Sequence, residues 1–91
     1  KMLEKEIEKK LKTEIKKLDG LCLKFTSPGF TGVPDRVVLL KTGSIFFVEL
    51  KQKGKDLSPR QKFVRKQFEY LGHKVYKIDS IEQIKKLIND L

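Results

Sequence analysis

Two apolar runs separated by a Thr-Gly pair constrain the fold of this chain more than any other feature. The runs cover Arg36–Lys41 and Ser44–Leu50, and both are rich in Val, Ile and Phe. This composition predicts two β-strands, and Thr42-Gly43 between them predicts a hairpin. Because neither run alternates between apolar and polar residues, we expect both strands to be covered on both faces. The hairpin is therefore expected at the centre of a sheet with helices on its two sides.

Three segments have the patterns of helices. In the first, apolar residues recur every three or four positions among Lys and Glu, which predicts an amphipathic helix ending near Asp19-Gly20. That stripe consists of Leu3, Ile7, Leu11, Ile15 and Leu18. The second begins at Ser58-Pro59-Arg60-Gln61, with a capping Ser, Pro at the first helical position and Gln three residues after the cap. Its expected buried stripe is Phe63, Val64, Gln67, Phe68 and Leu71, before Gly72. The third follows Asp79-Ser80, with an expected core face of Ile81, Ile84, Leu87, Ile88 and Leu91.

Two more predicted strands, Leu21–Phe25 and Lys74–Ile78, complete the order α-β-β-β-α-β-α. A Gly/Pro-rich loop, Thr26–Pro34, precedes the hairpin, and a short basic loop, Gln52–Leu57, follows it. The order predicts one α/β domain over residues 1–91, with a central mixed four-stranded sheet flanked by helices. The helix from Pro59 is long enough for a right-handed crossover between parallel strands.

The charge of the chain favours a polyanionic partner. Lys and Arg number 21 against 12 Asp and Glu, a net charge of +9 spread along the whole sequence. Such a surplus attracts nucleic acid first and an anionic membrane surface second. A single Cys and a single His exclude a disulfide framework and a Cys/His zinc site. The opening Lys1-Met2 suggests that Met2 is the natural first residue. Since no signal-peptide core or membrane-spanning run is present, we expect a cytoplasmic protein with no membrane partner.

Two carboxylates and a lysine occur at matching ends of the hairpin strands. Asp35 precedes the second strand, while Glu49 and Lys51 end the third and, being two residues apart, share a face. Carboxylate oxygens suit a hard cation such as Mg²⁺ or Mn²⁺. A cation there would polarise a phosphate and activate water, and Lys51 would offset the charge that grows in the transition state. The pattern therefore predicts metal-dependent phosphodiester hydrolysis.

The register of the hairpin decides whether the two acids can meet. A two-residue turn at Thr42-Gly43 would place Asp35 opposite Leu50, facing away from Glu49. A three-residue loop, Thr42-Gly43-Ser44, or a bulge would shift the pairing and bring both acids to one face. The apolar pattern leaves the two registers open. The predicted function requires the shifted one.

Pro34-Asp35 followed by Glu49-Leu50-Lys51 resembles the PD-(D/E)xK nuclease signature. The segments GVPD, VELK and LSPRQ are similar to motifs of the VRR-NUC branch, the virus-type replication-repair nucleases. The resemblance spans nearly the whole chain. It implies a restriction-endonuclease-like α-β-β-β-α-β core with an added C-terminal helix. It further implies a deoxyribonuclease that uses Mg²⁺ or Mn²⁺ and no small-molecule cofactor.

The resemblance also implies roles for individual residues. Asp35 and Glu49 match metal-binding acids, the Leu50 carbonyl matches a further metal ligand, and Lys51 matches the catalytic lysine. An additional acid is expected from the first helix, with Glu8 as the first choice and Glu4 as the alternative. Gln61 matches a glutamine beside the site, although it can equally be the capping-box partner of Ser58.

The family resemblance implies branched DNA, such as flaps or four-way junctions, as substrate and a homodimer as the active form. The expected location is the cytoplasm of a bacterial or phage-infected cell. Phosphate contacts are expected from Lys53, Lys55, Arg60 and Lys62. Phe30 in the Gly-rich loop is expected to fold onto the core, with insertion into a DNA branch or a subunit interface as alternatives. The rival interpretations are a non-catalytic DNA-binding module of the same fold and a basic scaffold for a protein partner.

Overall fold

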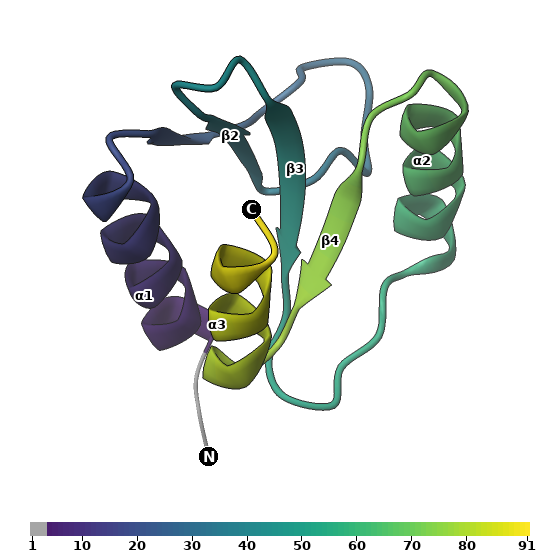
Figure 1. Cartoon of the computed structure of the whole chain (residues 1–91). Coiled ribbons are helices and arrows are strands. Elements are labelled where there is room, and N and C mark those ends of the chain that lie inside the picture. The colour runs from purple at the N-terminus through teal and green to yellow at the C-terminus, as the bar shows by residue number, and fades with distance from the viewer. Residues whose placement is uncertain (1–3) are drawn as a thin grey trace.

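Four strands form one mixed sheet with helices on both faces (Figure 1). The computed structural model describes residues 4–91, so Leu3 and the Lys1-Met2 pair lie outside the described part. The strands lie across the sheet in chain order, and their bounds are β1 (Leu21–Lys24), β2 (Arg36–Leu39), β3 (Ile45–Leu50) and β4 (Val75–Ile78). The β1–β2 and β2–β3 pairs are antiparallel, and the β3–β4 pair is parallel. The helices are α1 (Glu4–Lys17), α2 (Pro59–Tyr70) and α3 (Ile81–Asn89). The predicted element order and mixed sheet are confirmed.

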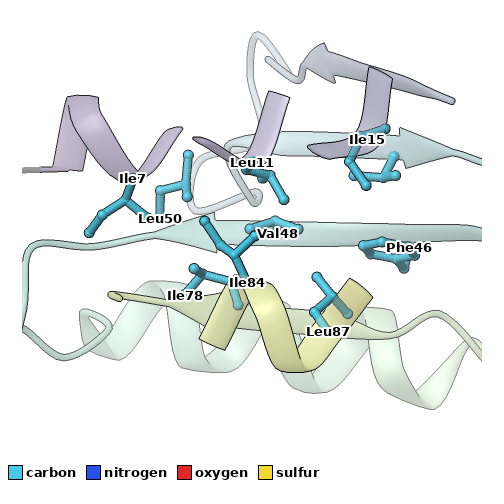
Figure 2. Packing of buried hydrophobic residues seen from close by; sticks show 10 residues of the cluster. Ile7, Leu11, Ile15, Phe46, Val48, Leu50, Ile78, Ile84 and Leu87 are labelled. Carbon is cyan, nitrogen blue, oxygen red and sulfur yellow. The ribbon is translucent and has the colours of Figure 1, made fainter. Parts of the chain in front are cut away.

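The main core lies between the sheet and the pair α1 and α3, which share one face (Figures 1 and 2). Helix α1 contributes three fully buried residues spaced by four, Ile7, Leu11 and Ile15. Leu18, the other described member of the predicted stripe, lies just after the helix and is half-buried. The three buried residues meet alternate residues of β3, namely Phe46, Val48 and Leu50, together with Ile84 and Leu87 of α3. Burial of each such side chain stabilises the fold by about 1.5–3 kcal/mol.

Helix α2 covers the opposite face of the sheet beside β4 (Figure 1). Val64 is fully buried there, and the Phe68 ring lies edge-on to Phe47 of β3 at 4.9 Å between centroids. The predicted buried stripe of this helix is wrong at three positions, because Phe63 is 52% exposed, Leu71 is 69% exposed, and Gln67 is exposed as well. A single helix over a sheet edge buries only a narrow stripe, so residues at the flanks of that stripe remain in water.

The same narrow coverage corrects the expectation that the hairpin is covered on both faces. Ile45 at the start of β3 is exposed, as are Leu21 and Leu23 of the edge strand β1. Leu23 is paired with Val37, which is only half-buried. The outer part of the α2 face therefore presents apolar side chains to solvent.

The hairpin loop contains three residues, Lys41, Thr42 and Gly43, rather than the alternative loop Thr42-Gly43-Ser44. The Leu40 N–H donates to the Ser44 carbonyl at 3.0 Å, and the Gly43 N–H donates to the Leu40 carbonyl at 2.9 Å. Gly43 has a φ of +93°, which a side chain would disfavour. The resulting register pairs Arg36 with Val48. The next pair outward is Asp35 and Glu49, directly opposite each other.

Across residues 4–91, no helix combines the length and the apolar character needed to cross a membrane.

Candidate active site

Asp35 is held at the start of β2 from two sides. Its carbonyl accepts a hydrogen bond from the Phe25 N–H at 2.9 Å, which ties the end of the Gly-rich loop to β1. Its carboxyl Oδ2 accepts from the Leu50 N–H at 2.8 Å. The side chain therefore lies across the end of β3 in a fixed position, next to Glu49.

Glu49 is a buried acid on the α2 face of the sheet. Phe46, Val48 and Leu50 point to the main core, so the alternate residues of β3 point to the opposite face. Glu49 is only 2% exposed, and its carboxyl is hydrogen-bonded to that of Asp35. Burial, and then the hydrogen bond to Asp35 and its charge, raise the pKa of Glu49 to about 8, while Lys51 acts in the opposite direction. Near neutral pH the metal-free pair therefore holds a proton that an exposed acid would have lost.

Lys51 lies directly after β3, where its N–H donates to the Ile78 carbonyl of β4 at 3.0 Å. Two residues beyond Glu49, it is on the same side of the chain. Its charge lowers the pKa values of both Glu49 and Glu4. The Lys51 ammonium group and the carboxyl groups of Asp35 and Glu49 thus share one margin of the sheet.

Glu4, the first described residue of α1, belongs electrostatically to this margin. Burial and the Asp35 charge raise the pKa of Glu4, and Lys51 opposes them. One turn later in α1, Ile7 joins Leu50 in the core, which sets the start of the helix near the end of β3 (Figure 2).

Glu8 has a different set of neighbours. Its Oε2 lies 3.0 Å from Nη2 of Arg36 and accepts from Nε of that residue at 3.2 Å. Arg36 is 8% exposed and also donates from Nη1 to the Cys22 carbonyl at 3.3 Å. The arrangement ties α1 to β1 and β2 beside Asp35, because a buried guanidinium requires a compensating charge and acceptors.

The Asp35–Glu49 pair fits a hard divalent cation. Both ligands supply carboxylate oxygens, and a cation between them would replace the proton that their mutual repulsion retains. Within the described residues, no cluster of three or more His, Cys, Asp or Glu is placed to hold an ion. The oxygen donors of the pair suit a hard divalent cation in general.

The other predicted site residues lie in the first turn of α2 or in the loop that precedes this helix. Gln61 is the capping-box partner: its Oε1 accepts from the Ser58 N–H at 2.8 Å, and its own N–H donates to Ser58 Oγ at 3.1 Å. Lys62 is 2.9 Å from Asp56, and Arg60 donates from Nε to the Thr31 carbonyl at 3.0 Å. Lys53 and Lys55 are exposed on the loop between β3 and α2.

The sequence prediction missed two residues near the site: Lys77 in β4 and Asp79 directly after this strand. Lys77 is paired with Glu49 across β3 and β4, so the two side chains leave the same face of the sheet. Asp79 Oδ2 lies 3.7 Å from Lys77 Nζ and accepts from the Gly54 N–H at 3.2 Å, so it anchors the loop that carries Lys53 and Lys55. Asp79 was predicted only as part of the α3 cap, where Ser80 supplies the accepting oxygen. The parallel register, which no local pattern encodes, was the missing signal.

Comparisons with known proteins agree with the fold. No family model matches the chain. Over 77 residues it is 46% identical to "Putative nuclease p44" of Acyrthosiphon pisum secondary endosymbiont phage 1, covering 85% of this chain and 83% of the phage protein. A solved structure of a VRR_NUC domain superposes with a TM-score of 0.89 at 33% identity and is matched over 94% of each chain. The chain belongs to the VRR-NUC family of nuclease domains.

Proposed function

We propose that residues 1–91 form one Mg²⁺- or Mn²⁺-dependent DNA endonuclease domain that hydrolyses phosphodiester bonds. The observation that carries the proposal is the hydrogen-bonded carboxyl pair of the half-buried Asp35 and the buried Glu49, held together at the sheet margin beside Lys51. Two carboxyl groups this close repel each other when both are ionised, and a bound divalent cation would offset that repulsion. A bound divalent ion supplies Lewis-acid polarisation of the phosphate and a more acidic water.

Each residue of the margin has a role in this proposal. Asp35 and Glu49 hold the ion, the Leu50 carbonyl is a further oxygen ligand, and Lys51 places positive charge where the phosphate becomes more negative. Lys51 acts as a charge stabiliser first and as a base only transiently. Gln61 orients the site through its side-chain amide, whose nitrogen is not required for the capping box.

Between Glu4 and Glu8, the two candidate acids of α1, the proposal assigns to Glu4 the role of the additional acid of the active site. The Asp35 charge raises the pKa of Glu4, whereas Glu8 neutralises Arg36. Glu8 then acts indirectly, by keeping α1 in register with β2 so that Glu4 stays at the margin.

Branched DNA, including flaps and four-way junctions, is the proposed substrate class. The net charge of +9 supports phosphate binding, and Lys53, Lys55, Arg60 and Lys62 lie on the loop after Lys51 and on the first turn of α2. Contacts from these cations to phosphates fit selection by DNA shape, because phosphate contacts carry no direct information on base sequence.

A homodimer is the proposed active form, and the cytoplasm of a bacterial or phage-infected cell its location. The exposed apolar residues of the sheet face, Leu21, Leu23 and Ile45, support a dimer because apolar surface of this kind usually marks an interface. Two subunits would offer two active sites to the two strands of a junction.

A panel of labelled single-stranded, duplex, flap, fork and four-way DNA substrates tests the proposal. The wild-type protein is expected to cut branched substrates with Mn²⁺ or Mg²⁺, and not in EDTA. The variants Asp35→Asn and Lys51→Met should bind DNA but not cut it. The control variant Lys85→Met changes an exposed residue of α3 and should cut like the wild type. Binding without cutting by the wild type would instead identify a non-catalytic module. Equal cutting by all variants, or DNA affinity without salt dependence, would refute the assignment.

A further inference from the structure

Arg60 at the start of α2 is flanked by two aromatic rings. Its guanidinium carbon lies 4.9 Å from the centroid of Phe30 and 5.4 Å from that of Phe63. Phe30 comes from the Gly-rich loop and Phe63 from the next turn of α2, so the two rings belong to segments far apart in the chain. Cation–π contacts of this length are favourable at exposed sites.

The arrangement is held rigidly. Arg60 Nε donates to the Thr31 carbonyl at 3.0 Å, which ties the loop to the helix. At Gly32, with φ +89°, a Cβ would come within 2.8 Å of Arg60 Cγ and 3.1 Å of Val64 Cγ2. The loop therefore lies directly on the first turns of α2, and only glycine permits that approach. Rigid rings lose little conformational entropy when they bind a ligand.

Both rings keep a large free surface. Phe30 is 40% exposed and Phe63 is 52% exposed, although each already contacts Arg60. Helix α2 carries the cations Arg60, Lys62, Arg65 and Lys66 against the single acid Glu69. Flat aromatic surface surrounded by positive charge fits a planar base attached to a phosphate chain better than an apolar protein segment.

We propose that Phe30, Arg60 and Phe63 form a stacking site for an unpaired nucleobase of the DNA substrate. This inference rests on the proposed function and names the feature of branched DNA that the domain would recognise. Phe30 is five residues before Asp35, so the Gly-rich loop that carries this ring leads into the active margin. The Arg60 guanidinium orders the two rings and adds a donor for the neighbouring phosphate. A base released from pairing at a branch would stack here while the adjoining strand enters the site.

Photo-crosslinking and binding measurements test the inference on the full chain. A fork with 5-iodouracil at the first unpaired nucleotide is irradiated with the protein in EDTA, and the crosslinked peptide is identified by mass spectrometry. We expect crosslinks at Phe30 or Phe63. Phe30→Leu and Phe63→Leu keep apolar bulk but remove the π-face. They should lower the ratio of fork affinity to blunt-duplex affinity by about tenfold, within the range found for single base–aromatic stacks.

Tyr70→Leu is the matched control, because Tyr70 is an exposed aromatic of the same helix outside the Arg60 cluster. Its affinity ratio should equal that of the wild type. Wild-type ratios in both Phe variants, or crosslinks confined to other peptides, overturn the inference while the nuclease assignment stands. A wild-type protein that neither binds nor cuts any DNA overturns the proposed function and this inference together.

Discussion

The Leu50 N–H donates to Oδ2 of Asp35 at 2.8 Å, across the two strands that carry the acids. A backbone donor thus orients the carboxyl group before any ion binds. The contact exists because the three-residue loop at Lys41–Gly43 sets the register of the hairpin. Asp35 therefore has a structural contact besides its proposed role as a metal ligand, and suitable substitutions can separate the two.

Substitution of Asp35 should separate folding from cutting. In Asp35→Asn an amide oxygen can still accept from Leu50, and loss of the charge relieves repulsion on Glu49. We expect the metal-free Tm to equal or exceed that of the wild type. Cutting should fall at least about 100-fold with the loss of a metal ligand. Asp35→Ala leaves the Leu50 N–H without its acceptor and should be about 1 kcal/mol less stable than Asp35→Asn. Similar cutting by Asp35→Asn and the wild type would contradict the assignment.

Glu49 should make the metal-free protein less stable as the pH rises. Its folded pKa of about 8 lies above the ordinary value of 4.5, so the folded state holds the proton more tightly than the unfolded state. This favourable contribution is complete below about pH 4.5 and is lost as the pH rises to about 8, by an amount on the order of a few kcal/mol. Tm measured in EDTA from pH 5 to 9 should fall more steeply for the wild type than for Glu49→Gln. Parallel curves would show that Glu49 does not carry the effect.

Metal binding should release a proton from the same pair. At pH 7 the acids hold a proton that a bound cation must displace, whereas at pH 9 little of it remains. Titration calorimetry with Mn²⁺ in two buffers of different ionisation enthalpy should give different heats at pH 7 and nearly equal heats at pH 9. Equal heats at pH 7 would mean that the ion binds elsewhere or that the pair is already ionised.

Much of the fold was predictable because periodicity and caps are local signals. Ser58 and Gln61 form the predicted capping box, and the Ile7–Leu11–Ile15 stripe is buried as expected. Features that depend on packing were not predictable. The register depends on a left-handed Gly43 and on where the loop begins, and the exposure of Phe63 depends on how narrowly α2 covers the sheet. The choice between Glu4 and Glu8 turns on the buried Arg36, whose orientation follows from that register.

Glu4 and Glu8, the two candidate acids of α1, should respond differently when their charge is removed. Glu4→Gln should cut DNA poorly but change the free energy of unfolding by less than about 0.5 kcal/mol, as is typical of surface positions. Glu8→Gln keeps an acceptor but removes the charge that balances Arg36, which should cost about 1–3 kcal/mol. Urea unfolding, and cutting assays at a temperature where both variants are folded, compare them. A larger loss of cutting in Glu8→Gln than in Glu4→Gln would reverse the assignment.

Two glycines of the same loop provide a matched test of the contact between the loop and α2. Gly29 and Gly32 both have positive φ, but a Cβ at Gly29 meets no atom within 4 Å, whereas one at Gly32 meets Arg60 and Val64. Gly29→Ala should cost about 1 kcal/mol for the left-handed conformation alone. Gly32→Ala adds an overlap with α2 and should cost roughly 1–3 kcal/mol more. Because that overlap pushes the segment leading to Asp35 away from α2, Gly32→Ala should also reduce cutting at temperatures where it remains folded. Equal unfolding free energies for the two variants would mean that the loop does not rest on the helix in solution.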